Sequence, residues 1–433
     1  MAQYWNKQAE TMSRDELHHM QGERLKDLVT RVYASVPFYY KKMRELDVAP
    51  EDIKSVEDVR YLPFTTKQDL RDHYPFGLFA VPQSEIVRIH ASSGTTGKPT
   101  VAGYTQSDLD VWAELMARAM TCAGVTRDSV VHIAYGYGLF TGGLGAHYGA
   151  EKVGASVVPV SGGNTQRQLM LLEDFKATAL CCTPSYALNL ADAYLSQGKD
   201  ISALSLRTGV FGAEPWTDAM RAQIEEKLRI EAFDIYGLTE MMGPGVAIEC
   251  SRHDGLHVWE DHFLPEIIGE DEQPLPYNTE GELVFTTLTK RGMPLLRYRT
   301  HDLSCLSDAP CECGRTAVRM RRVKARTDDM LIIRGVNVFP SQIEHTLLHI
   351  PGVEPHYLII VDRKGSLDTL EVQVELSKTL VGDTVRELES LRAQIENHIA
   401  SEVLVHASVK LCQPGSLPRS EGKLKRVIDK RNM

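Results

Sequence analysis

The sequence predicts an α/β protein with a large N-terminal domain of parallel-rich sheets flanked by helices, followed by a small α+β C-terminal domain. From Ile86 to about Val323, strand-like apolar runs alternate with helical patterns, which is typical of parallel strands covered by helices. Near residue 325 a polar segment precedes a short unit with strand and helix patterns of its own. We therefore expect domains at 1–325 and 331–433, joined through 326–330.

The spacing of apolar residues predicts the elements of the large domain. Residues 14–35 carry leucine and methionine near helical spacing and predict a helix, which Pro37 ends. Residues 63–70 predict a loop that opens a short helix. The later patterns predict strands at 130–134, 155–160 and 179–182 and helices at 165–175 and 217–228.

The small domain shows both periodicities. Strict alternation over 370–376 predicts a half-buried strand, and an apolar stripe over 385–399 predicts a helix. Further patterns predict a helix at 343–350 and strands at 357–361 and 405–411. The tail from Gly415 is basic and contains glycine, so it predicts either a disordered end or a loop that reaches an anion.

Composition narrows the class of protein. The chain has 433 residues, 43% of them hydrophobic and 24% charged, with a net charge of −10. A broad nucleic-acid surface is not expected at this charge. No basic and apolar leader and no apolar run of roughly 18 to 20 residues is evident, so we expect a cytoplasmic protein without membrane contact. The eight cysteines are then expected to be thiols or metal ligands.

One loop points to phosphate chemistry. Two glycines, a lysine and several hydroxyls stand together in Ser92, Ser93, Gly94, Thr95, Thr96, Gly97 and Lys98. Glycines let the backbone approach a ligand closely, and free N–H groups, hydroxyls and a lysine suit phosphate oxygens. The Walker A spacing is not met, because Ser92 replaces the first glycine and Pro99 follows the lysine. A plain surface turn is the alternative.

Other polar segments follow apolar runs, where open α/β sheets bind ligands. They are 211–216, 236–240, 298–303, 326–329 and 417–426. Each is weak when taken singly, because a lone Glu240 could be a surface carboxylate and a lone Lys423 a solvated lysine.

In this order, the segments resemble the adenylate-forming superfamily of acyl-CoA synthetases, and within it the phenylacetate–CoA ligase family. The resemblance covers nearly the whole chain, including 35–40 and 62–67, and rests most strongly on Ser-Gly-Thr-Thr-Gly-Lys-Pro-Thr and Tyr-Gly-Leu-Thr-Glu. The chain departs from it at His301 and Ala325, where the superfamily usually has glycine. Neither departure removes a functional side chain.

The resemblance implies a two-step reaction. A carboxylate attacks the α-phosphorus of ATP to give an acyl-adenylate and pyrophosphate, and the thiol of coenzyme A then displaces AMP. The loop of residues 92–98 would hold the departing phosphates, Glu240 would bind Mg²⁺ and Thr239 would contact the α-phosphate. Lys423 would stabilise the charge between the phosphate and the carboxylate, and Arg326 would assist at the nucleotide.

The same resemblance implies the nucleotide contacts and a hinge. Asp302 would accept hydrogen bonds from the ribose hydroxyls. The remaining adenosine contacts would be Gly212, Ala213, Glu214, Asp234, Tyr236 and Gly237. The small domain would be mobile and would rotate about Asp328 between the half-reactions, withdrawing Lys423; a solvated linker carboxylate is the alternative for Asp328.

The acid is expected beside the segment 132–143. Its glycines leave room for an arene on which aromatic side chains could stack. The pocket residues we expect are Tyr135, Phe140, Gly142, Ala213 and Pro244, and the alternative is that the aromatics are plain core.

Three sulfurs and an imidazole form a candidate zinc set. Cys250, His257, Cys311 and Cys313 have the donor types of a tetrahedral structural site, and members of this ligase branch resemble the pattern. Competing ligands are His253, His262 and Cys305, and unligated thiols are the alternative.

The sequence therefore predicts an AMP-forming ligase that joins an aryl acid, best phenylacetate, to coenzyme A. Indoleacetate, benzoate or adenylyl transfer to a cofactor hydroxyl remain alternatives. A GTPase-like switch is disfavoured by the loop spacing, and a non-catalytic nucleotide sensor by the presence of Lys423 and Glu240. The oligomeric state is left open, with a homodimer as one alternative.

Overall fold

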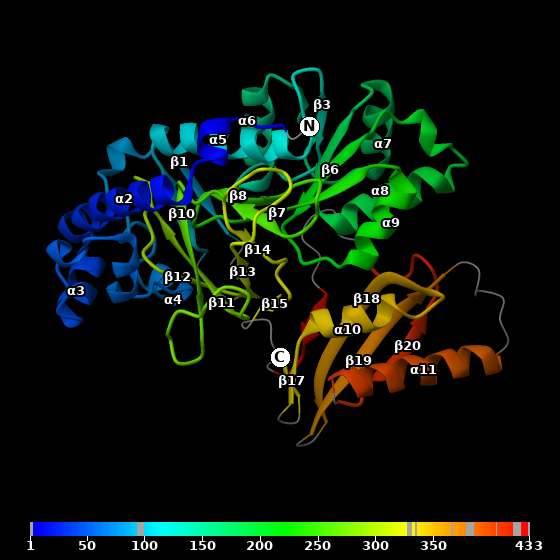
Figure 1. Cartoon of the computed structure of the whole chain (residues 1–433). Helices are drawn as coiled ribbons and strands as arrows, with labels where there is room; N and C mark the ends of the chain where they lie inside the picture. Colours follow the sequence, from blue (N-terminus) through cyan, green and yellow to red (C-terminus); the bar gives the residue numbers. More distant parts are fainter. Residues whose placement is uncertain are drawn as a thin grey trace.

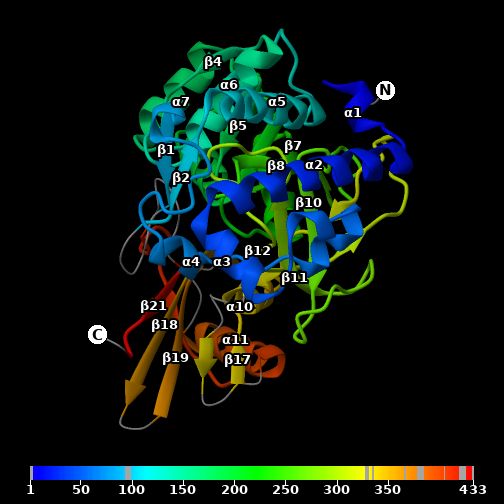
Figure 2. The same cartoon turned by 90° about the vertical axis from the view of Figure 1, so that its left-hand side faces the viewer.

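The computed structural model places a large α/β part formed by residues up to 326 beside a small part formed by the later residues (Figure 1). It describes residues 3–92, 99–326, 331–333, 336–364, 367–377, 385–403, 405–418 and 426–431. In both views the small part lies below the large one (Figure 2). None of the helices in these ranges combines the length and the apolar character that crossing a bilayer requires.

Several helices of the large part begin at side-chain caps. Ser13 accepts from the backbone N–H of Glu16, and the Glu16 side chain accepts from the backbone N–H of Ser13 in return, a capping box that starts the predicted helix at Arg14. The helices are α1 (Lys7–Glu10), α2 (Arg14–Ser35), α3 (Pro37–Glu45), α4 (Lys67–Asp72), α5 (Gln106–Cys122), α6 (Gly142–Val153), α7 (Thr165–Asp174), α8 (Pro184–Ser196) and α9 (Asp218–Leu228). Short 3₁₀ turns are η1 (Pro50–Asp52), η2 (Val56–Tyr61), η3 (Gln83–Glu85) and η4 (Ile201–Ala203).

The main sheet is mixed. Its order is β13-β14-β9-β8-β7-β6-β5-β3-β4. The strands are β3 (Val130–Ile133), β4 (Ser156–Val158), β5 (Ala179–Cys182), β6 (Thr208–Gly212), β7 (Glu231–Leu238), β8 (Gly243–Glu249), β9 (Leu256–Val258), β13 (Leu306–Ser307) and β14 (Arg319–Met320). Pairing is parallel from β4 to β7, as predicted, and antiparallel from β7 to β13.

A second sheet is wholly antiparallel, in the order β10-β11-β12-β15. Its strands are β10 (Phe263–Ile268), β11 (Gly281–Thr287), β12 (Tyr298–Ser304) and β15 (Ala325–Arg326), and a separate hairpin is formed by β1 (Arg88–Ala91) and β2 (Val101–Tyr104). The α/β class of the large part is therefore confirmed, and the parallel ladders of its sheets lie among the neighbouring strands β4, β3, β5, β6 and β7.

The small part has a hydrophobic core of its own, which contains residues from Leu331 to Val427 only. A four-stranded sheet in the order β20-β19-β18-β21 packs against two helices that contact each other. The elements are β16 (Leu331–Ile333), β17 (Val336–Val338), α10 (Pro340–Leu348), β18 (Val353–Lys364), β19 (Leu367–Leu376), α11 (Val385–Val403), β20 (Ser408–Cys412) and β21 (Val427–Asp429). The predicted α+β character is confirmed.

Both flanks of the segment 419–425 are tied to the small sheet. Glu375 accepts hydrogen bonds from the backbone N–H groups of Gly415 and Leu417, at 3.0 and 2.7 Å. On the other side, β21 pairs in parallel with β18. The last strand of the structure thus lies beside the first long strand of the small part.

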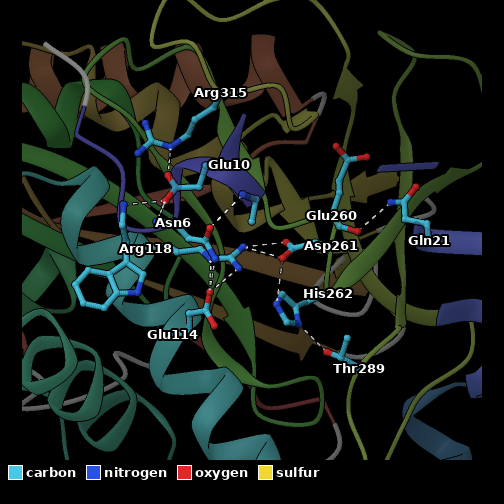
Figure 3. Close-up of polar contacts among 12 residues, drawn as sticks. Asn6, Glu10, Gln21, Glu114, Arg118, Glu260, Asp261, His262, Thr289 and Arg315 are labelled. Atoms are coloured by element: carbon cyan, nitrogen blue, oxygen red, sulfur yellow. Dashed lines mark hydrogen bonds and ion pairs between the residues drawn. The ribbon is translucent and has the colours of Figure 1, made fainter. Parts of the chain in front are cut away.

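A buried polar network joins the N-terminal helices to the rest of the large part (Figure 3). Arg118 of α5 is 2% exposed and donates to both carboxylate oxygens of Asp261, at 2.9 and 3.0 Å, and to Glu114 at 2.7 Å. Gln21 of α2 donates to the carbonyl of Glu260 at 2.9 Å. These contacts fix the turn that leads into β10.

Candidate functional site

Several predicted site residues stand where β6 and β7 end. β6 ends at Gly212 and β7 at Leu238, and the two strands are parallel. Ala213 has a φ of 70°, a left-handed conformation that breaks the strand. Because the carboxyl ends of parallel strands meet at one sheet edge, the segments 213–216 and 239–240 follow side by side.

Asp302 is the centre of a buried polar cluster. It is 3% exposed; the Tyr236 hydroxyl donates to its Oδ2 at 2.6 Å, and Arg326 Nη1 lies 3.2 Å from its Oδ1. Asp302 and Arg326 are also partners in the pairing of β12 with β15. Burial raises the pKa of Tyr236 well above its usual value, so the phenol stays a donor. Three residues predicted from separate motifs therefore meet at one carboxylate.

A second cluster surrounds Thr239 and Glu240. Glu240 is 5% exposed, and the Tyr298 hydroxyl donates to its Oε1 at 2.6 Å. The hydroxyl oxygens of Thr141 and Thr239 lie 3.3 Å apart. This arrangement leaves Glu240 with one carboxylate oxygen fixed by a phenol and places a hydroxyl next to it in the chain.

Two side chains hold the backbone of the Thr239–Glu240 turn by hydrogen bonds to its carbonyls. The Tyr104 hydroxyl donates to the carbonyl of Thr239 at 2.8 Å, and Lys290 Nζ donates to the carbonyl of Glu240 at 3.0 Å. We did not predict Tyr104, Lys290, Tyr298 or Thr141 as site residues. Tyr298 and Thr141 carried a signal, since Tyr298 opens the segment that contains Asp302 and Thr141 belongs to the segment 132–143.

Glu214 caps a helix. Its Oε1 accepts from the backbone N–H of Ser185, in the first turn of α8, at 2.7 Å. Burial raises its pKa, while the charge of Arg426 from the small part acts in the opposite direction. A side chain on Gly212 would collide with the carbonyl of Ile235 on β7, so glycine is needed for the strands to approach there.

Asp234 belongs to a different environment from Tyr236. Its carboxylate lies 3.2 Å from Arg322 Nε, and its backbone N–H donates to Glu249 at 2.9 Å. Burial and the nearby charge of Glu249 raise the pKa of Asp234 to about 6. The structure places this residue in a buried charge cluster with Arg322 and Glu249.

The expected acid-binding residues follow β3 and precede α6. Tyr135 is half-buried, and the Cβ position of Gly142 lies 3.4 Å from its ring. Phe140 is 52% exposed, so it is not plain core. The carbonyl of Pro244 accepts from Trp112 Nε1 at 2.9 Å. A side chain on Gly237 would collide with the carbonyl of Gly243, so β7 and β8 approach closely beside the Thr239–Glu240 turn.

Several predicted residues lie outside the described ones: Ser93, Gly94, Thr95, Thr96, Gly97, Lys98, Asp328 and Lys423. Ser92 is described, and its backbone N–H donates to the carbonyl of Thr100 at 2.9 Å. Ala91 donates to the carbonyl of Leu139 at 3.0 Å. The start of the predicted phosphate loop is thus fixed beside the segment 136–143.

The four predicted metal ligands converge. Donor atoms of Cys250, His257, Cys311 and Cys313 all lie within 4.8 Å of one another. The sulfurs of Cys250 and Cys311 are 3.7 Å apart, and Cys313 Sγ is 3.3 Å from His257 Nε2. A tetrahedral zinc with sulfur at about 2.3 Å would separate two sulfurs by about 3.8 Å. The hydrogen bond from Cys250 and the neighbouring His257 lower the pKa of the Cys313 thiol, which favours the thiolate that binds metal.

Fold and site together define an AMP-binding, adenylate-forming enzyme. The family model of the AMP-binding enzyme matches residues 19–288, and that of the AMP-binding enzyme C-terminal domain matches residues 335–431. The chain is 53% identical to the phenylacetate-coenzyme A ligase of Thermus thermophilus over 98% of both chains. It is 52% identical to that of Escherichia coli K12, over 98% of this chain and 97% of the other. The chain belongs to the phenylacetate-coenzyme A ligase family and is an AMP-forming acid–thiol ligase.

A solved structure resembles the whole chain. The 2-hydroxyisobutyryl-CoA ligase in the postadenylation state, in complex with 2-HIB-AMP, matches with a TM-score of 0.92 at 30% identity, over 99% of this chain and 92% of the other. The same ligase with 2-HIB-AMP and CoA in the thioesterification state gives 0.73, over 99% and 93%. Because both belong to one enzyme, the difference in TM-score reflects the arrangement of its parts. The present arrangement resembles the postadenylation state.

Proposed function

We propose that this protein ligates phenylacetate to coenzyme A at the expense of ATP, through an acyl-adenylate. The observation that supports the adenylation chemistry is the meeting of two clusters, one around Asp302 and one around Thr239 and Glu240, at the edge where β7 ends. The choice of phenylacetate rests on four phenylacetate-coenzyme A ligases that are 50–53% identical over 98% of this chain.

In the first step, a carboxylate oxygen of the acid attacks the α-phosphorus of ATP and the bond to pyrophosphate breaks. Asp302 would accept the ribose hydroxyls, with Tyr236 and Arg326 holding its carboxylate. Thr239 would donate to the α-phosphate, and Glu240 would hold Mg²⁺, which neutralises phosphate charge when bound. Lys423 would stabilise the negative charge that develops between the two reactants.

In the second step, the sulfur of coenzyme A attacks the acyl carbon, the bond to AMP breaks and the thiol proton is released. We propose that the small domain, residues 331–433, rotates between the steps. The hinge would be the segment 326–330, with the rotation centred on Asp328. The separate hydrophobic core of the small domain supports this, because such a unit can move as one body.

The remaining predicted residues would contact the two substrates. The adenine would be framed by Glu214, Ala213, Gly212 and Gly237. The arene would be framed by Tyr135, Phe140, Gly142 and Pro244. Asp234 would support the nucleotide from its charge cluster.

We further propose that Cys250, His257, Cys311 and Cys313 hold a structural zinc ion. The donor set and the 3.7 Å sulfur separation fit tetrahedral coordination. All four ligands come from the protein, which suits a site that joins two segments. We also propose a cytoplasmic location; the oligomeric state stays open, with a homodimer as one alternative.

The experiment is a measurement of pyrophosphate release over a panel of acids, with and without coenzyme A. Phenylacetate is expected to give the highest kcat/KM, above indoleacetate, benzoate and 2-hydroxyisobutyrate, and thioester is expected only with coenzyme A present. If none of the acids in the panel stimulates pyrophosphate release, the ligase proposal is overturned. A higher kcat/KM with another aryl acid would overturn only the choice of phenylacetate.

A further inference from the structure

Lys290 is a buried cation that the mechanism above does not use. It lies in the turn that follows β11 and is 0% exposed. The turn is held firmly: Asp108 of α5 accepts from the backbone N–H groups of Arg291 and Gly292, at 2.6 and 2.8 Å. Arg31 of α2 donates to the carbonyl of Lys290 at 3.0 Å. The backbone is thus fixed on two sides.

The lysine side chain reaches the catalytic turn. Its Nζ donates to the carbonyl of Glu240 at 3.0 Å and lies 4.3 Å from the centre of the Tyr104 ring. The same tyrosine donates to the carbonyl of Thr239. Two consecutive carbonyls of the turn are therefore held by one cation–aromatic pair, while Tyr298 fixes the Glu240 carboxylate.

Burying a charged ammonium costs desolvation free energy unless nearby negative groups compensate for it. A neutral side chain of equal length would fill the same space without that cost. The reaction assembles negative charge at this turn, from the Glu240 carboxylate and the phosphates of ATP. A fixed positive charge beneath the turn opposes the mutual repulsion of these groups.

We propose that Lys290 is a positioning residue for adenylation, which holds the Thr239–Glu240 turn in its working geometry and supplies a buried positive charge beneath it. The proposal rests on the proposed function of this site. Because Lys290 acts on the residues expected at the reacting phosphate and not on the adenosine contacts, its loss should lower kcat for adenylation more than it raises KM for ATP.

The charge gives a readout that a purely structural role would lack. A neutral side chain of similar length removes the positive charge beneath the turn, whereas a guanidinium keeps it. If the charge matters, only the cationic replacement should retain the adenylation rate.

The test compares Lys290→Met and Lys290→Arg with the wild type in first-turnover pyrophosphate release without coenzyme A. We expect Lys290→Met to lower kcat about 10- to 100-fold and to change KM for ATP less than about threefold. Lys290→Arg should keep most of the rate, because its guanidinium carries the same charge.

Two controls make the outcome decisive. Thioester formation from supplied acyl-adenylate should stay within about twofold of the wild type in both variants. Lys199→Met, which removes an exposed lysine paired with Glu173, should leave both half-reactions unchanged. Equal loss in both half-reactions, or an equal loss of adenylation rate in Lys290→Met and Lys290→Arg, would overturn the proposal. A wild type that releases no pyrophosphate with any acid would instead overturn the proposed function.

Discussion

His301 stands next to Asp302 with a φ of 63°, in the left-handed region where glycine is favoured. This explains why glycine is common at the position among the enzymes that the sequence resembles. Glu282 compensates for the histidine, because its Oε1 accepts from the backbone N–H of His301 at 3.1 Å and lies 3.2 Å from the imidazole Nδ1. One carboxylate thus supports the backbone beside Asp302, the residue that we propose binds the ribose.

Glu282 makes stability depend on pH. Burial acts to raise its pKa, but the hydrogen bonds from His301 and Arg299 outweigh it and lower the pKa to about 2. A carboxylate with a lowered pKa stabilises the fold above its ordinary pKa, and this contribution disappears as the pH falls from about 4.5 toward 2. We expect Glu282→Gln to cost about 3 kcal/mol at pH 7 and progressively less below pH 4.5.

Urea unfolding of both proteins at pH 7, 4 and 3 measures this dependence. Glu272→Gln is the matched control, because Glu272 also pairs with Arg299 but is 59% exposed and should cost less than about 1 kcal/mol. A cost of Glu282→Gln that stays constant across this pH range would contradict the assignment.

At the scale of elements, the segment with two of the proposed zinc ligands also binds the N-terminal residues. The Tyr4 hydroxyl donates to the carbonyl of Cys313 at 2.6 Å, and Arg315 donates to the carbonyl of Gln3 at 2.6 Å and to Glu10 at 2.8 Å. Figure 3 shows Arg315 and Glu10 at one end of the buried network. An interaction that holds Cys311 and Cys313 in place therefore also holds residues 3–10.

Metal removal should loosen that start. We expect tag-free protein to contain about one zinc per chain, and chelation to lower Tm and to speed proteolysis within residues 3–12. Cys313→Ser should reproduce the effect, whereas Cys412→Ser, which lies far along the chain on β20, should not. Less than about 0.3 zinc per chain, or unchanged proteolysis after chelation, would count against the site.

At the scale of the whole molecule, the arrangement resembles the postadenylation state of 2-hydroxyisobutyryl-CoA ligase more than its thioesterification state, which supports the proposed rotation of the small domain between the half-reactions. We expect Lys423→Ala to abolish pyrophosphate release while sparing thioester formation from supplied acyl-adenylate. The physical reason is that the ammonium stabilises charge only at the reacting phosphorus. Single-turnover assays of each half-reaction measure this.

Lys430→Ala is the matched control in the same tail, because only its backbone N–H is bonded to the sheet, at the carbonyl of Val361. It should leave both half-reactions unchanged. An equal loss in both half-reactions for Lys423→Ala would contradict the role assigned to this lysine.

Motif order predicted several residues of the site. Thr239 directly follows β7, whereas Tyr236 and Asp302 lie within β7 and β12, and the structure places all three in neighbouring clusters. Lys290 and Tyr104 carried no local signal, because their role arises only where the turn after β11 and the strand β2 meet beneath Glu240. Asp234 is paired with Arg322, a contact across the fold that no spacing in the sequence reveals.

Contacts between distant parts of the chain also limited how much of the sheets could be predicted from the sequence. The predicted strands at 130–134 and 179–182 are long apolar runs, and they pair in parallel as expected. The antiparallel half contains strands as short as β13, β14 and β15, which leave too few residues for a period of two to be recognised. Their partners are set by long-range packing, and so the mixed sheet could not be predicted.

The two anchors around the segment 419–425 have a kinetic consequence. Glu375 holds residues 415 and 417, and β21 fastens the chain again at Val427. A group held between two fixed points of a chain samples a smaller volume than one near a free end, which raises its effective concentration. In the sequence, Lys423 stands between these two anchors. We therefore expect release of the β21 anchor alone to slow pyrophosphate release under the proposed mechanism, even though the lysine itself is unchanged.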